Sequence, residues 1–253
     1  MRAFLSASGR LVLRVLRGAG AYALLAGRLL IATPRMDGRE WLRTVSIAGV
    51  DALPLCLVTA ALTGALVVIQ TGFYVESYGV TSLVGWGVGY ALFHEFAPLI
   101  ASLALSGRVG AGQASDIAGL RAGEQLPALE ALGVDIDRAL LAPRFWAIAA
   151  SVVVLAVIAD VVALSASLLV AVGLLGVPPG AFLASVHASL RVADAVPGIV
   201  KAAAFGLALG ACSLRAGLAA PAEARGVGAA ARRSLVATLT AILALDMALT
   251  GLL

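Results

Sequence analysis

Five long apolar stretches constrain this chain more than any other feature of its sequence. They run approximately over 53–74, 83–105, 145–175, 196–214 and 234–253. A helix of about 20 apolar residues can span a bilayer, because in lipid every backbone polar group must be hydrogen-bonded within its own segment. With 61% apolar residues and a mean hydropathy of +1.02, the chain lacks the polar surface of a soluble globule. We predict an all-α integral membrane protein with about five transmembrane helices.

Arginines flank these stretches unevenly, and their distribution predicts the topology. Eight arginines precede the first stretch, none lies between the first and second, four lie between the second and third, one between the third and fourth, and four between the fourth and fifth. Positive residues concentrate on the cytoplasmic side of membrane proteins. The N-terminus and residues 108–144 and 215–233 are therefore expected in the cytoplasm, and the C-terminus outside. The same placement argues against nucleic-acid binding as the reason for the formal charge of +4.

We expect residues 1–52 to form an N-terminal interfacial region and residues 53–253 to form the transmembrane domain. A helix near the N-terminus would place three arginines on one face and three apolar side chains toward lipid: Arg10, Arg14 and Arg17, and Leu11, Val15 and Leu16. This pattern predicts an amphipathic helix on the cytoplasmic membrane surface, with a basic tail as the alternative. A secretory signal is not expected, because Arg28 interrupts the next apolar run and no small-residue cleavage site follows.

A charged segment at 119–144 separates the second and third stretches. It holds seven charged residues in a chain that is 13% charged overall. Cap and break residues predict three short helices: one closed by Gly123, one from Pro127 to Gly133, and one capped by Asp135 that stops before Pro143. A compact charged unit of this kind suits the docking of a soluble partner. A solvated linker between two spans is the alternative.

Four charged residues fall inside the apolar stretches: Glu95, Asp160, Lys201 and Asp246. A charge in the hydrocarbon layer costs at least about 2.5 kcal/mol, so such residues are usually paired or functional. We predict that Lys201 pairs with Glu95 or Asp246 inside the bundle and joins these spans around a transport path. A static buried salt bridge that only fixes helix register is the alternative.

Small and aromatic residues suggest two further features. Gly206 and Gly210 form a small-xxx-small pair that lets helices approach closely. Tyr74, Tyr78 and Trp86 cluster near the outer end of the first two spans, where aromatic residues favour the membrane interface. These three side chains could also line an exit from a path between the spans.

The sequence offers no convincing catalytic, cofactor or metal site. His94 and Glu95 would begin an H-E-x-x-H zinc motif, but position 98 is proline. Cys56 and Cys212 lie in apolar runs without metal-ligand spacing. The only lysine, Lys201, lies in "GIVKAA", so the chain has no G-x-x-x-x-G-K-[ST] phosphate loop. Any ATP hydrolysis must come from another polypeptide.

Three sequence segments together resemble one known family. They are "FHEFAPLIASLALSGRVGAGQASDIAGLRAGEQLPALEALGVDIDRALLAPRFWA", "DAVPGIVKAAAFG" and "RGVGAAARRSLVATLTAILALDMALT". In these segments the chain resembles the MlaE permeases of bacterial ABC-type lipid transporters, relatives of the YrbE subunits of mammalian-cell-entry (MCE) systems. The resemblance covers nearly the whole chain. One departure is His94, where the family commonly has arginine.

The resemblance implies a permease subunit in the bacterial inner membrane that moves phospholipid or related lipids. Its expected partners are a cytoplasmic ABC ATPase, a periplasmic MCE-domain protein and a second copy of itself. Residues 108–144 would then be the coupling segment, which contacts the ATPase through four residues: Arg121, Glu124, Gln125 and Glu130. The alternatives are an MCE-system importer of sterols or fatty acids, a self-powered secondary transporter and an intramembrane enzyme.

Overall fold

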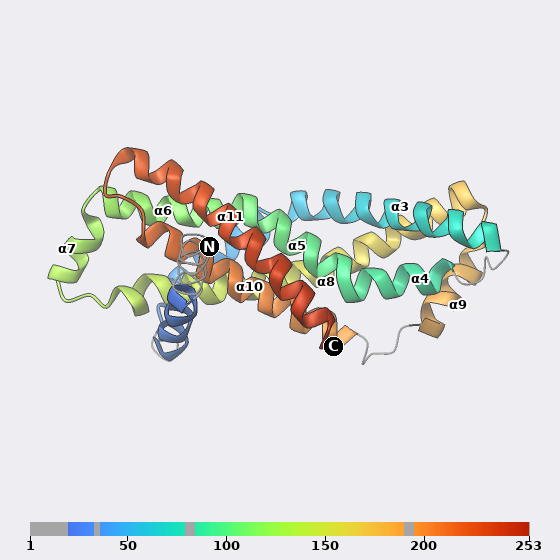
Figure 1. The fold of residues 1–253 in the computed structure, drawn as a ribbon, viewed down its shortest axis with the longest axis horizontal. Coiled ribbons are helices and arrows are strands. Elements are labelled where there is room, and N and C mark those ends of the chain that lie inside the picture. Colours follow the sequence, from blue (N-terminus) through green and yellow to red (C-terminus); the bar gives the residue numbers. More distant parts are fainter. Residues whose placement is uncertain (1–19, 33–35, 79–83, 190–194, 253) are drawn as a thin grey trace, which may run out of the picture.

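The computed structural model describes residues 20–32, 36–78, 84–189 and 195–252. In these ranges every regular element is helical, and most helices run along one long axis (Figure 1). A first helix covers Gly20–Ala32. The others are α2 (Gly38–Val45), η2 (Ser46–Val50), α3 (Leu53–Tyr78), α4 (Val84–Ala91), η4 (Leu92–Phe96), α5 (Ala97–Leu105), η5 (Ser106–Gly110), α6 (Ala111–Ala122), α7 (Gln125–Ala131), η6 (Asp137–Leu141), α8 (Ala142–Leu175), α9 (Pro179–Ser189), α10 (Ala195–Leu218) and α11 (Ala224–Thr250), where η marks a π-helical segment.

Five helical runs within the described ranges are long and apolar enough to cross a membrane: Gly38–Phe73, Gly85–Ala122, Asp137–Leu175, Ala195–Leu218 and Ala224–Thr250. The prediction of an all-α, multi-pass membrane protein with five spans is therefore confirmed. The third run has 39 residues. At about 1.5 Å per residue it is nearly twice as long as the hydrocarbon layer of about 30 Å, so part of it extends beyond that layer or tilts within it.

The charged segment differs from its prediction at two points: α7 begins at Gln125 and not at Pro127, and the third helix does not stop before Pro143. α6 ends at Gly123 and α7 is followed by Gly133, as expected. The prediction that a third short helix stops before Pro143 is wrong, because η6 continues directly into α8. Pro143 lies where η6 passes into α8, and the wider π-helical turn before it accommodates a residue that lacks the N–H.

Helices approach each other closely where glycine faces a neighbouring backbone. α10 crosses α8 at Gly206, where a Cβ atom would lie 2.8 Å from Ala149 Cα. Gly210, one turn later, lies against Phe145, and a Cβ atom at this position would lie 3.0 Å from the Phe145 ring. The expectation that Gly206 and Gly210 permit close helix packing is confirmed. Since α10 also packs along α11, it is the central helix of this part of the bundle.

α7 and α9 lie at opposite ends of the molecule (Figure 1). We call these the α7 end and the α9 end. α3, α4 and α8 reach toward the α9 end, whereas the last turn of α11 stops short of it, beside the start of α10 (Figure 1). The two ends therefore have different construction: α9 packs on α4, and α7 projects beyond the spans.

The helix Gly20–Ala32 packs onto the α7 end. Leu25 and Leu29 are buried in an apolar cluster with Ile117 of α6 and Leu214 of α10. The six residues of the expected amphipathic helix, from Arg10 to Arg17, lie outside the described ranges. The expected domain boundary at 52/53 falls inside the helical run Gly38–Phe73.

Candidate functional site

Three spans bring their charged residues together around one lysine. Lys201 Nζ on α10 lies 2.7 Å from Glu95 Oε1 on η4 and 3.5 Å from Asp246 Oδ1 on α11. The Lys201 side chain is only 3% exposed. Both carboxylates that the sequence offered as partners therefore contact the same ammonium group. We call Glu95, Lys201, Asp246 and Thr250 the charge cluster.

Thr250 belongs to this cluster and was not among the residues predicted from the sequence. Lys201 Nζ donates to Thr250 Oγ1 at 2.7 Å, and Thr250 Oγ1 lies 2.9 Å from Glu95 Oε1. The same hydroxyl lies 2.8 Å from the carbonyl oxygen of Asp246, one turn earlier in α11. The i, i+4 spacing of Asp246 and Thr250 was the available signal, because residues four apart share one helix face. The hydroxyl supplies an additional partner to both the ammonium and the Glu95 carboxylate.

Local backbone features place Glu95 against α10. Pro98 has no N–H and its ring clashes with the carbonyl four residues earlier, so a regular α-helix is disfavoured here. The chain adopts the wider π-helical turn η4 just before this proline. At Gly198 of α10 a Cβ atom would collide with the carbonyl oxygen of Phe93. Glycine at this position lets α10 approach η4 closely, one turn before Lys201.

An aromatic stack runs along α4 and ends at His94 of η4, the residue before Glu95 in the chain. The rings of Trp86 and Tyr90 are stacked with centroids 6.0 Å apart, and those of Tyr90 and His94 with centroids 4.1 Å apart. Trp86 and Tyr90 are about half exposed. Trp86 was predicted from the sequence, whereas the i, i+4 series that continues through Tyr90 and His94 was not. The other two predicted lipid-path side chains, Tyr74 and Tyr78, lie outside the part of the chain whose side chains the structure describes.

The expected coupling residues lie at the α7 end but do not all face outward. Glu124, Gln125 and Glu130 are exposed. Arg121 instead donates through Nη1 to the carbonyl oxygen of Leu218, in the last turn of α10. The structure therefore places three of the four residues on the outer surface of this end and uses Arg121 to join α6 to α10.

α7 is attached through Leu126 and Leu129, which pack in one apolar cluster, and its C-terminal tip is exposed. Leu126 is buried in the cluster that holds the helix Gly20–Ala32. Leu132, just after α7, is 80% exposed. Glu124 has a positive φ of 57°, a conformation that is uncommon for a residue other than glycine, and it forms the turn between α6 and α7. This turn directs α7 away from the spans.

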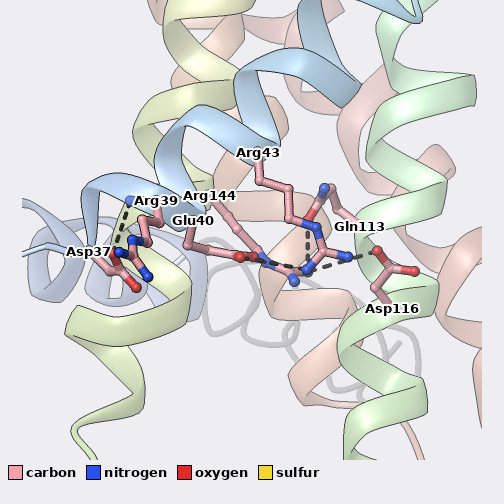
Figure 2. A network of polar contacts seen from close by, with 7 residues as sticks. All are labelled: Asp37, Arg39, Glu40, Arg43, Gln113, Asp116 and Arg144. Atoms are coloured by element: carbon pink, nitrogen blue, oxygen red, sulfur yellow. Dashed lines mark hydrogen bonds and ion pairs between the residues drawn. The ribbon is translucent and has the colours of Figure 1, made fainter.

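A second polar network lies at the α7 end (Figure 2). Its residues were not predicted from the sequence to interact. Arg144 Nε donates to Glu40 Oε1 of α2 at 2.7 Å, and Arg144 Nη1 donates to Gln113 Oε1 of α6 at 3.0 Å. Asp116 is more distant, with 3.9 Å between its Oδ2 and Arg144 Nη1. Glu40 also lies 3.7 Å from Arg43. The available signal was an arginine directly after Pro143, at the start of the longest apolar run.

Within the described residues, no group of three or more His, Cys, Asp or Glu side chains is placed to hold a metal ion. Cys56 and Cys212 are both buried and unpaired with each other. Two basic side chains in the described ranges are buried, Lys201 and Arg144, and each is the centre of one of the two networks.

Comparison with known proteins gives relatives that align with most of this chain. The intermembrane phospholipid transport system permease protein MlaE of Haemophilus influenzae is 28% identical over 253 residues, which covers 99% of this chain and 97% of that protein. A probable ABC transporter permease protein of Rickettsia typhi is 31% identical over 84% of this chain and 82% of its own length. The chloroplastic protein TRIGALACTOSYLDIACYLGLYCEROL 1 of Arabidopsis thaliana is 26% identical over 96% of this chain and 65% of its own length.

The family model for permease MlaE matches residues 41–252, which include the charge cluster, α7 and Arg144. With five apolar spans and a match over most of its length, this chain belongs to the MlaE permease family.

Proposed function

We propose that this chain is the membrane-spanning subunit of an ABC transporter that moves phospholipid or a related lipid between the bacterial inner membrane and a periplasmic carrier. The observation that carries the proposal is the similarity, over 99% of the chain, to a permease of an intermembrane phospholipid transport system. The sequence has no phosphate-binding loop. In this proposal the chain is not itself catalytic, and a separate ATPase subunit hydrolyses ATP.

The proposed ATPase-docking surface is the outer face of the α7 end. Glu124, Gln125 and Glu130 offer exposed polar groups, and the 80% exposed Leu132 offers an apolar contact beside them. A small apolar anchor with a polar rim is typical of protein interfaces. Arg121 supports this surface by its hydrogen bond to the end of α10. Motion of a bound ATPase would reach the spans through α6 and α8, which continue from both sides of α7.

This function requires the α7 end to lie in the cytoplasm. Arg225, Arg232 and Arg233 are exposed in the first part of α11, which also lies at the α7 end (Figure 1). Positive residues favour the cytoplasmic side. In this orientation the α9 end and the C-terminus face the periplasm, where we expect the MCE-domain partner to bind.

The proposed lipid path follows the aromatic stack and the charge cluster. Trp86 and Tyr90 are about half exposed along α4, and the stack ends at His94, the residue before Glu95 in the chain. Acyl chains can pass along such an apolar face, while polar head groups can interact with the charges of the cluster. Tyr74 and Tyr78 remain predicted members of this path. A second copy of the chain would complete the path from the other side.

Reconstitution with defined partners tests this function. The tagged chain is purified from its native membrane, and copurified proteins are identified by mass spectrometry. The complex is then placed in phospholipid vesicles, and the ATP-dependent transfer of fluorescent phosphatidylethanolamine between the vesicles and the purified carrier is measured. We expect an ABC ATPase in the complex and transfer that stops in the absence of ATP.

Other outcomes would contradict the proposal in distinguishable ways. Transfer driven by an ion gradient without an ATPase would indicate a secondary transporter. ATP-dependent transfer of a labelled sterol or fatty acid, with no transfer of phospholipid, would indicate the importer function. Chemical modification of the labelled lipid by the chain alone would indicate an intramembrane enzyme.

A further inference from the structure

The Arg144 network joins elements on both sides of the proposed coupling segment. Arg144 begins α8, its partner Glu40 lies on α2, and its partner Gln113 lies on α6. α2 continues through η2 into the first span, Gly38–Phe73, and α6 leads directly to α7. The Arg144 side chain, which belongs to the third span, therefore contacts the first and second spans at the α7 end, as Figure 2 shows.

We propose that the Arg144–Glu40 pair is the joint through which motion of α7 reaches the first span, so that Arg144 and Glu40 are positioning residues for transport. The proposal rests on the proposed function, because it requires an ATPase that moves α7. Arg144 contacts neither the charge cluster nor the aromatic stack, and it acts through the helices that it holds.

Burial keeps the Arg144–Glu40 pair intact, and the geometry of the guanidinium fixes the relative positions of the helices that it joins. The Arg144 side chain is 8% exposed and that of Glu40 is 15% exposed, so neither charge can be left unpaired without a large cost. The planar guanidinium uses Nε for Glu40 and Nη1 for Gln113. Because these donors point in fixed directions, the group fixes α2 relative to α6 as well as relative to α8.

A second contact holds the start of α2 to the same segment. The N–H of Asp37 donates to the carbonyl oxygen of Arg138 in η6 at 3.3 Å, and the Asp37 side chain accepts from the N–H of Arg39 and so caps α2. The Asp37–Arg138 hydrogen bond and the Arg144–Glu40 pair together hold α2 against the segment 137–144.

The other face of α2 is packed less tightly against α8. A cleft of about 260 Å³ separates α2, η2 and the start of α3 from α8, and residues such as Trp41, Val45 and Val154 line it. Ser151, also in this lining, is buried, and its hydroxyl has no hydrogen-bond partner among the residues that the structure describes. The cleft leaves this side of α2 incompletely packed, and the polar network adds directional contacts from α2 to α8 and, through Arg144, to α6.

The test uses the complete transporter in phospholipid vesicles, with fluorescent phosphatidylethanolamine as the probe. The double variant Glu40→Met with Arg144→Met replaces the pair by apolar side chains, which avoids an unpaired buried charge. We expect it to assemble and to hydrolyse ATP within about twofold of the parent, while the lipid moved per ATP falls about tenfold or more. The control Asp116→Asn changes the 60% exposed, 3.9 Å partner of the same network and should leave that ratio unchanged.

Two results would contradict the role of the Arg144–Glu40 pair as a joint. In one, the double variant moves as much lipid per ATP as the parent; in the other, its ATP hydrolysis and its lipid transport fall in proportion. A parent complex that moves no phospholipid would contradict the proposed function instead. The joint is then judged by spin labels at the exposed positions Leu42 and Leu132. When nucleotide is added, the distance between the two labels should stay the same in the parent, because the pair makes α2 and α7 move together, and should change in the double variant. The same response in both proteins would contradict the inference.

Discussion

The Lys201 ammonium lies between the Glu95 carboxylate, at 2.7 Å, and the Asp246 carboxylate, at 3.5 Å. One buried cation thus faces two anions from two other spans. Removal of the cation leaves two carboxylates facing each other, whereas removal of either carboxylate leaves the cation with one partner. The three residues are therefore not equivalent, although each is a charge in an apolar span.

We predict that Lys201→Met destabilises the protein more than Glu95→Gln or Asp246→Asn does. Breaking a buried pair typically costs about 3–5 kcal/mol, while replacing all partners together can be nearly neutral. The triple variant Lys201→Met, Glu95→Gln, Asp246→Asn should therefore recover thermal stability in detergent. Transport by the stable triple variant distinguishes the roles: normal transport indicates a scaffold, and its loss indicates a role in the lipid path. A fully stable and active Lys201→Met single variant would contradict both roles.

A second prediction concerns α7. Glu124→Lys combined with Glu130→Lys should release the ATPase while the permease stays folded in the membrane. Reversal of an exposed charge contact changes binding by about 1 kcal/mol, so two reversals should lower the amount of copurified ATPase about tenfold or more. Glu223→Lys, at an exposed acid outside 108–144, is the matched control and should retain the ATPase. Normal ATPase stoichiometry in the double variant would place the docking surface elsewhere.

The third prediction tests the orientation. In a background without Cys56 and Cys212, a cysteine introduced at Ser77 or at the exposed Ala181 of α9 should react with an impermeant thiol reagent from the periplasm. A cysteine at the exposed Ala222, beside α11, should react only after the cells are opened. The reverse labelling pattern would overturn the orientation and the assignment of α7 to the cytoplasm.

The fourth prediction compares two glycines. Gly206→Ala should lower thermal stability, because the new Cβ would lie 2.8 Å from Ala149 Cα and the two helices would have to separate. Gly173→Ala is the matched control on α8, because no described atom outside its own helical turn lies within 4 Å of its new Cβ. It should be neutral or stabilising by up to about 1 kcal/mol, as expected for alanine in place of glycine within a helix. Equal effects of the two substitutions would show that α10 and α8 tolerate a wider spacing.

The spans were predictable because hydropathy is a local property of the chain. A helix in lipid satisfies its own backbone, so about 20 apolar residues are enough to define it without knowledge of its neighbours. The ends of helices were less predictable. Pro143 indicates a break when it is considered alone, but the π-helical turn η6 precedes it, and the helical run that begins at Asp137 continues through it.

The partners within each network were decided by the tertiary structure. The sequence indicated that Lys201 needs an anion, since an unpaired charge in lipid is costly, but left open which one. The answer depends on the rotation and spacing of α10 against η4 and α11, which Gly198 and the π-helical turn before Pro98 set. The Arg144–Glu40 pair has the same origin: its residues are 104 positions apart, and only the packing of α2 on α8 brings them together.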